Sequence, residues 1–168
     1  MKNIIAILIS TFALLFSFNA HAQNTAADDL CVATFGDGKT FYAKVLAKDG
    51  KRVHTKMRHS DALYSFEGTT VKSSSGAYKV GHKCSSIVYY GPRSKDLYHV
   101  GDYIEVVFGD GEAFYAKVDS IGNDGVVATF LHSGNTYKFN GKGTVISSTG
   151  DYKAGHKTKS IMLLPRRK

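Results

Sequence analysis

An internal repeat constrains the fold of this chain more than any other feature. Residues 35–45, FGDGKTFYAKV, return as FGDGEAFYAKV at 108–118, a shift of 73 positions (108 minus 35). After one inserted residue the shift becomes 74 (152 minus 78), and YKVGHK at 78–83 returns as YKAGHK at 152–157. Self-similarity of this length indicates one structural unit that is made twice.

Short strands joined by tight turns are predicted within each unit. In the second unit the β-branched and aromatic runs are bounded by turn sequences such as Gly109-Asp110-Gly111 and Asn123-Asp124-Gly125. Five strands are expected, the last after a Gly/Ser/Lys-rich excursion, at 103–108, about 113–118, 126–131, 136–139 and 160–164. Such a small meander must close to bury a core and remove its edges, so the predicted fold is all-β, with two tandem five-stranded barrels. No sustained 3.6-residue apolar period follows the N-terminal segment, and helices are expected to be brief or absent.

The N-terminus has the pattern of a secretory signal peptide. Lys2 precedes an apolar run, 4–18, that is shorter than the roughly 20 residues of a membrane-spanning helix. The small-residue sequence Ala20-His21-Ala22 then predicts cleavage after Ala22, with a retained anchor as the alternative. The expected mature protein, of 146 residues (168 minus 22), is periplasmic or secreted and does not span a membrane.

The repeat also sets the expected domain boundaries. A signal peptide, residues 1–22, is followed by a first barrel over 23–91 and a polar, turn-prone linker over 92–98. The second barrel covers 99–165 and leaves a basic tail at 166–168. Because the linker is short, the two modules are expected to touch.

Two cysteines, Cys31 and Cys84, bracket the first repeat. The matching positions of the second repeat hold Ile104 and Thr158, so both thiols are absent there together. In an exported protein this pattern predicts one disulfide. Two cysteines this far apart do not favour a metal or redox site.

The second repeat resembles the Tudor family. The resemblance rests on about forty residues, with a strand after a Gly-Asp pair, an Asp-Gly turn, an aromatic-Tyr-x-Ala strand, a Val-rich strand and a Gly-Asn turn. Here these are Gly101-Asp102, Asp110-Gly111, Phe114 to Val118, Val127 to Phe130 and Gly134-Asn135. The resemblance implies an SH3-like barrel that binds methylated lysine or arginine in an aromatic cage.

Carried over residue by residue, the implied cage of the second repeat is Phe108, Phe114 and Phe130, with Asn135 as the polar neighbour. Ser133 stands where the family has a fourth aromatic residue. The weaker equivalent in the first repeat is Phe35, Phe41 and Met57. The alternative is that these phenylalanines are core, as alternating aromatic residues in short strands usually are.

The charge of the chain favours anionic ligands over cationic ones. Lys and Arg outnumber Asp and Glu by 22 to 14, a net charge of +8 that becomes +7 if Lys2 is removed with the signal peptide. Such a surface attracts nucleic acid, acidic glycans or lipid headgroups through a salt-sensitive attraction. The alternative is that these charges only keep a small barrel soluble.

No motif in the sequence indicates catalysis, and no cofactor or metal is expected. His82 and His156 recur in Gly-His-Lys, but no zinc-protease, nucleophile-elbow or close carboxylate-pair pattern accompanies them. The leading hypothesis is therefore a non-enzymatic binding module for a peptide or a modified side chain. The alternatives are a basic envelope-binding or polyanion-binding protein and a structural partner in an exported protein complex.

Overall fold

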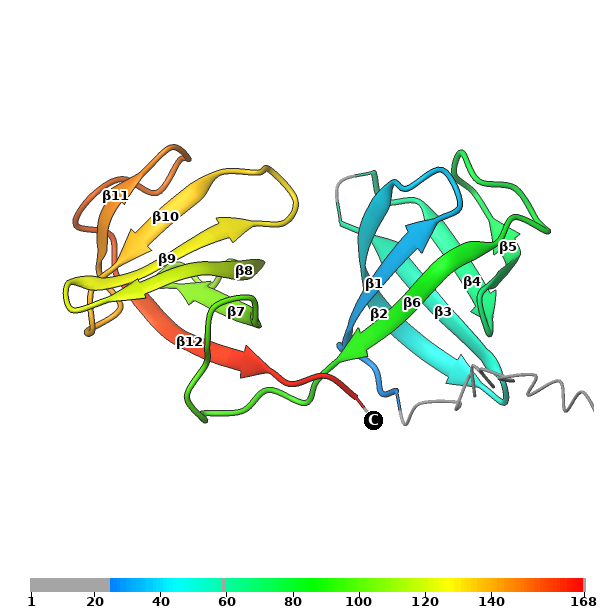
Figure 1. Cartoon of the computed structure of the whole chain (residues 1–168), viewed down its shortest axis with the longest axis horizontal. Helices are drawn as coiled ribbons and strands as arrows, with labels where there is room; N and C mark the ends of the chain where they lie inside the picture. Colours follow the sequence, from blue (N-terminus) through cyan, green and yellow to red (C-terminus); the bar gives the residue numbers. More distant parts are fainter. Residues whose placement is uncertain (1–24, 59, 168) are drawn as a thin grey trace, which may run out of the picture.

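The computed structural model describes residues 25–58 and 60–167, and it is all-β, with two six-stranded antiparallel sheets that correspond to the two repeats (Figure 1). The predicted signal peptide and its cleavage site lie outside the described residues. Within those residues there is no helix long and apolar enough to cross a bilayer.

The first sheet has the strand order β5-β4-β3-β2-β1-β6. Its strands are β1 (Leu30–Phe35), β2 (Thr40–Asp49), β3 (Arg52–Met57), β4 (Leu63–Glu67), β5 (Thr70–Ser74) and β6 (Cys84–Tyr90). Consecutive strands therefore pair as a meander from β1 to β5, and β6 returns to the outer side of β1.

The second sheet repeats this order as β11-β10-β9-β8-β7-β12. Its strands are β7 (Tyr103–Phe108), β8 (Ala113–Gly122), β9 (Gly125–Phe130), β10 (Thr136–Phe139), β11 (Val145–Ser148) and β12 (Thr158–Leu164). The predicted bounds of β7 and β10 are confirmed, whereas β8 is four residues longer (122 minus 118) than expected. The predicted count of five strands is wrong, because β11 forms within the Gly/Ser/Lys-rich excursion, where Val145 is its only buried residue.

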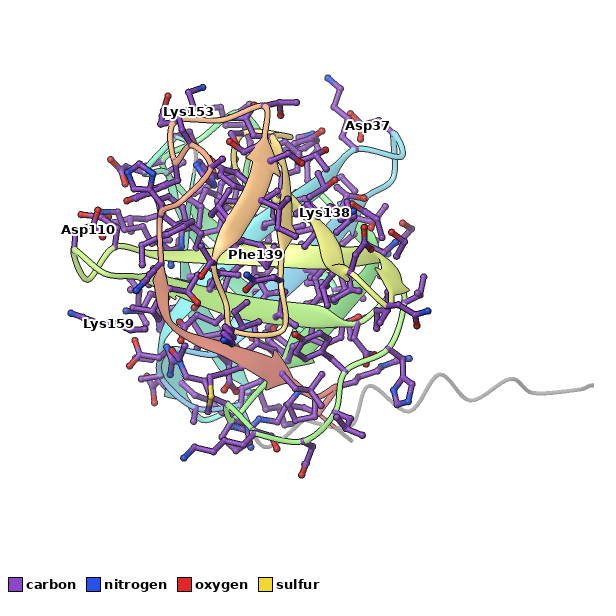
Figure 2. The ribbon with its side chains drawn as sticks, turned by 90° about the vertical axis from the view of Figure 1, so that its left-hand side faces the viewer. Asp37, Asp110, Lys138, Phe139, Lys153 and Lys159 are labelled. Carbon is purple, nitrogen blue, oxygen red and sulfur yellow. The ribbon has the colours of Figure 1, made fainter. Side chains whose placement is uncertain are left out.

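Each sheet buries alternate residues of its strands, as a period of two requires. On β7 the inward side chains are Ile104, Val106 and Phe108, and β1 presents Cys31, Ala33 and Phe35 in the same way. Phe139 of β10 is fully buried in the second core, whereas Asp110 lies at the projecting tip of the β7–β8 hairpin (Figure 2). At that tip the Asp110 carboxylate accepts a hydrogen bond from the Glu112 N–H, and Gly111 has φ = +96°. The conformation explains why this turn ends in glycine.

The predicted disulfide between Cys31 and Cys84 is wrong. Both cysteines are free and buried. Although they lie on neighbouring strands, Cys31 pairs with Tyr89 and Cys84 pairs with Phe35. At about 3.3 Å per residue this register separates their positions by about 13 Å, whereas a disulfide needs Cα atoms within about 7 Å.

The two modules meet through equivalent faces. The outward residues Leu30 and Val32 of β1 are buried as well as the inward ones, because they pack in a third cluster with Tyr115 and Leu164. The cluster is bordered by the partly buried residues Tyr42, Tyr90, Tyr103 and Leu131. Six of these residues form equivalent pairs across the repeat, namely Leu30 with Tyr103, Tyr42 with Tyr115 and Tyr90 with Leu164. The chain therefore contains an interface of the kind seen in a symmetric dimer.

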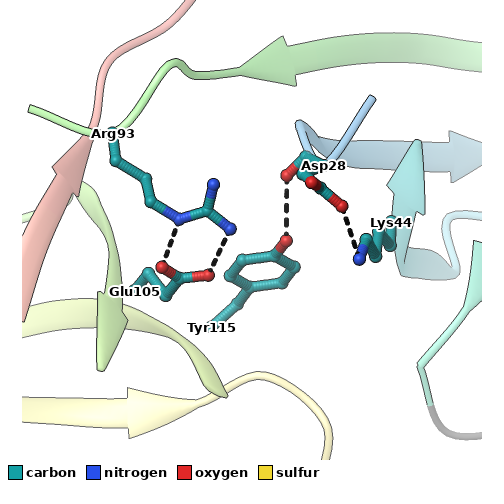
Figure 3. Close-up of polar contacts among 5 residues, drawn as sticks. All are labelled: Asp28, Lys44, Arg93, Glu105 and Tyr115. Atoms are coloured by element: carbon teal, nitrogen blue, oxygen red, sulfur yellow. Dashed lines mark hydrogen bonds and ion pairs between the residues drawn. The ribbon is translucent and has the colours of Figure 1, made fainter. Parts of the chain in front are cut away.

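Polar contacts fasten the segments around this interface (Figure 3). The Tyr115 hydroxyl of the second module donates a hydrogen bond of 3.1 Å to the Asp28 carbonyl of the first, and the Lys44 ammonium lies 2.5 Å from the Asp28 carboxylate. Arg93, in the segment predicted as a linker, forms a two-bond ion pair with the buried Glu105 carboxylate. The connecting segment is therefore fixed to the second sheet.

The C-terminal segment returns to the first module, as the red trace in Figure 1 shows. The Arg167 guanidinium donates two hydrogen bonds of 3.0 Å to the carboxylate of Asp29, whose side chain is only 4% exposed. The Arg167 N–H also donates to the Tyr89 carbonyl at 2.8 Å. Arg167, which was predicted to lie in a basic tail, thus joins the C-terminal end of the described chain to its N-terminal end.

Candidate ligand-binding cleft between the repeats

The structure brings the three predicted cage residues of the second repeat together, but mostly within the core. Phe108 and Phe130 are each 1% exposed, and Phe114 is half-buried. The ring centroids of Phe114 and Phe130 lie 5.2 Å apart, and those of Phe108 and Phe130 lie 6.1 Å apart. Asn135 lies in the β9–β10 turn, where its N–H donates to the Ser133 hydroxyl at 3.2 Å. Of the three rings, Phe114 alone has substantial exposure.

A tyrosine that sequence reasoning missed covers the face of Phe108. Tyr152 stacks on it with ring centroids 3.6 Å apart and planes 2° from parallel, and the Tyr152 hydroxyl donates to the Asp110 carboxylate at 2.8 Å. Burial, and then this hydrogen bond, raise the pKa of Tyr152 to about 12. The signal was present in the sequence, since the Gly-Asp-Gly and Tyr-Lys motifs recur together in both repeats.

The first repeat has the same arrangement. Tyr78 stacks on Phe35 with centroids 3.6 Å apart, and its hydroxyl donates to the Asp37 carboxylate at 2.7 Å. Phe35 and Met57 are each 1% exposed, while Phe41 is half-buried with its ring nearly perpendicular to that of Phe35. Both sets of predicted cage positions thus lie largely in hydrophobic cores, with a Tyr–Asp pair over the rim.

A separate cleft of about 180 Å³ lies where the two modules meet. Tyr42 and Arg58 line it from the first repeat, and six residues line it from the second, namely Glu112, Ala113, Phe114, Tyr115, Leu131 and His132. Phe114 is therefore the predicted cage residue that faces this space. The other lining residues were not predicted, because the sequence did not show which outward faces of the modules meet.

The walls of the cleft are aromatic and its charged groups are few. The Arg58 guanidinium lies 4.6 Å from the centroid of the Tyr115 ring, a cation–π contact. The His132 ring stacks on Phe114 with centroids 5.0 Å apart. Burial, followed by the positive charge of Arg58, lowers the pKa of His132, so this imidazole is neutral at pH 7. The remaining charge on the lining is the exposed Glu112 carboxylate.

The recurrent histidines of the Gly-His-Lys motifs have local partners. The Nδ1 atoms of His82 and His156 each lie 2.9 Å from a backbone carbonyl oxygen, of Lys79 and Lys153 respectively. No group of three or more His, Cys, Asp or Glu side chains placed to hold a metal ion occurs within residues 25–58 and 60–167. The arrangement of the cleft is therefore that of a small binding site with aromatic walls, one guanidinium and one carboxylate.

Comparison of the chain with known protein families, with curated proteins and with solved structures found no match.

Proposed function

We propose that this chain is an exported, non-enzymatic binding protein that holds a peptide segment or a modified side chain of another protein in the cleft between its two repeats. The observation that carries the proposal is the cleft itself. It is concave, lined mainly by aromatic and apolar side chains, and supplied by both repeats. Ligand sites commonly combine such walls with a few polar groups that fix orientation.

We also propose that each module is a closed, Tudor-like barrel of the SH3 type. Backbone hydrogen bonds from the first residue of the last strand to the segment just before the strand at the opposite edge support closure. The Cys84 N–H, at the start of β6, donates to the Thr69 carbonyl beside β5 at 2.8 Å, and the Thr158 N–H donates to the Gly143 carbonyl at 2.9 Å in the second module. Closed modules of this kind would give the cleft rigid walls.

A cage for methylated lysine is the less favoured form of this function. Tyr152 and Tyr78 cover Phe108 and Phe35, and Arg58 already occupies one face of Tyr115. A methylammonium group in the cleft would also meet the positive charge of Arg58. We therefore expect peptide recognition to use the aromatic walls of the cleft rather than a cage built on Phe108.

The test is an amide NMR titration of residues 23–168 with blocked tetrapeptides whose central residue is aromatic, aliphatic, acidic or trimethyl-lysine. Saturable shifts at Tyr42, Phe114, Leu131 and His132 are expected with at least one class. The Ala113→Leu substitution should abolish them by filling the cleft. Its matched control is Thr40→Leu, at the equivalent exposed position of the first repeat, outside the cleft. Peptides that shift no cleft residue would refute the proposal.

Binding of a polyanion to the surface is the second candidate, because several exposed lysines have no carboxylate within ion-pair distance among the described residues. Lys153, whose ammonium donates to the Gly150 carbonyl, and Lys159 lie on either side of Asp110 in the view of Figure 2. An anionic hexanucleotide would then shift residues around these lysines, and added salt would reverse the shifts. Shifts that persist in salt and centre on the cleft favour the peptide site instead.

A further inference from the structure

Arg58 is bonded differently from Arg93 and Arg167, two other arginines near the junction of the modules. Arg93 and Arg167 each form a two-bond ion pair with a carboxylate, of Glu105 and Asp29 respectively. Arg58 has no carboxylate within ion-pair distance among the residues that the structure describes, and its guanidinium lies over the Tyr115 ring instead. The planar fork of a guanidinium matches a carboxylate, and Arg58, whose described partner is Tyr115, lines the cleft.

The backbone holds Arg58 in a defined place. Its N–H donates to the Tyr42 carbonyl at 3.2 Å, and the N–H of Leu131, its equivalent in the second repeat, donates to the Tyr115 carbonyl at 2.9 Å. Both residues line the cleft. The same position of the repeat thus supplies a cation to one wall and an apolar side chain to another, an asymmetry that suits a ligand with one charged and one apolar part.

The other charged groups at the cleft set its preference. His132 is neutral at pH 7 because burial and Arg58 lower its pKa, while Asp151 has a smaller effect in the opposite direction. Glu112 carries the one negative charge on the lining. A ligand with a single carboxylate directed at Arg58 is therefore favoured, and a second anionic group near Glu112 is disfavoured.

We propose that the cleft recognises a single carboxylate attached to an apolar or aromatic group, with Arg58 as the residue that binds the carboxylate. This inference rests on the proposed peptide-binding function and names its ligand chemistry. A cavity of about 180 Å³ is smaller than the roughly 300 Å³ at which drug-sized ligand pockets begin, so it takes one side chain or one chain end. The carboxylate comes from the C-terminus of a peptide or from an Asp or Glu side chain next to an apolar residue.

The test compares four probes that share a phenyl ring in titrations of residues 23–168. N-acetyl-phenylalanine carries a terminal carboxylate and its amide carries none, while N-acetyl-Phe-Glu-amide carries a side-chain carboxylate and N-acetyl-Phe-Gln-amide carries none. At least one acid should bind about tenfold more tightly than its neutral partner, as expected for a charge-assisted pair of hydrogen bonds. The acid with the larger advantage identifies the source of the carboxylate.

Substitutions then assign the effect to a residue. Arg58→Gln should remove the tighter binding of the acid, and so should Arg58→Leu, which introduces the residue found at the equivalent position of the second repeat. Glu112→Gln should increase the difference in affinity. Arg52→Gln is the matched control, since Arg52 is exposed at the start of β3, the strand that Arg58 directly follows, and lies outside the cleft. Equal binding of acids and neutral partners, or an advantage that survives Arg58→Gln, would overturn this inference while the peptide-binding proposal stands. If none of these probes and none of the tetrapeptides shifts the cleft, both proposals fail.

Discussion

The ion pair between Arg167 and Asp29 is predicted to be a large single contribution to stability. Its carboxylate is 4% exposed and its guanidinium 19% exposed, and two hydrogen bonds of 3.0 Å join them. The Arg167→Met substitution keeps much of the side-chain volume but leaves the buried carboxylate without its cation. Loss of one partner from a buried pair costs about 3–5 kcal/mol. Because Asp29 keeps a hydrogen bond from the Ala26 N–H, we expect the lower end, about 3 kcal/mol.

Urea denaturation followed by circular dichroism measures this effect. With a denaturant slope of about 2 kcal/mol per molar, a loss of 3 kcal/mol lowers the midpoint by about 1.5 M. Arg166→Met is the matched control, because Arg166 is exposed, and its change should stay within about 0.5 kcal/mol. If Arg167→Met shifts the midpoint no more than Arg166→Met does, Arg167 does not fasten the chain end and our account of the C-terminal segment is wrong.

Three further predictions concern the thiols, a hairpin carboxylate and a glycine. Burial raises the pKa values of both thiols, that of Cys84 to about 11. Iodoacetamide should therefore label neither cysteine in the native protein, and should label both in urea without reductant. A failure to label in urea would indicate a disulfide. Hydrogen bonds from the Glu112 N–H and the Tyr152 hydroxyl lower the pKa of Asp110 below 3.8, so its charged form stabilises the fold above that value and the contribution is lost as pH falls through the lowered pKa. The difference in unfolding free energy between wild type and Asp110→Asn should therefore be present at pH 7 and absent near pH 2, and an unchanged difference at low pH would contradict this. A Cβ atom on Gly125 would lie 1.9 Å from the Phe139 carbonyl oxygen, whereas one on Gly134 would meet nothing within 4 Å. Thermal unfolding should therefore show a far larger loss of stability for Gly125→Ala than the roughly 1 kcal/mol expected for Gly134→Ala. Equal losses would count against this backbone geometry.

Local chemistry made much of each module predictable. The Gly-Asp-Gly turn indicated where β7 ends and β8 begins, and the β-branched and aromatic residues of Tyr103 to Phe108 predicted a strand at its observed bounds. β11 escaped prediction because Val145-Ile146 is its only apolar pair, and the surrounding glycines and serines are typical of loops. β11 forms because it pairs with β10, and its own sequence does not indicate this pairing.

The candidate cleft was less predictable, because it depends on how outward faces meet. Leu30 and Val32 did contain a clue, since they make β1 apolar on both faces, a pattern typical of strands covered on both sides. The disulfide prediction failed for a related reason. The number of cysteines and the expected compartment say nothing of strand register, and register places Cys31 and Cys84 several residues apart.

The equivalent faces that join the two modules have a consequence for dilution. Two separate modules held by such a face would form a dimer, and the cleft between them would be lost at concentrations below the dissociation constant. Joined in one chain, the modules meet at an effective concentration that the connecting segment sets, which is millimolar for short tethers. The cleft between them is therefore formed in every molecule, at any protein concentration.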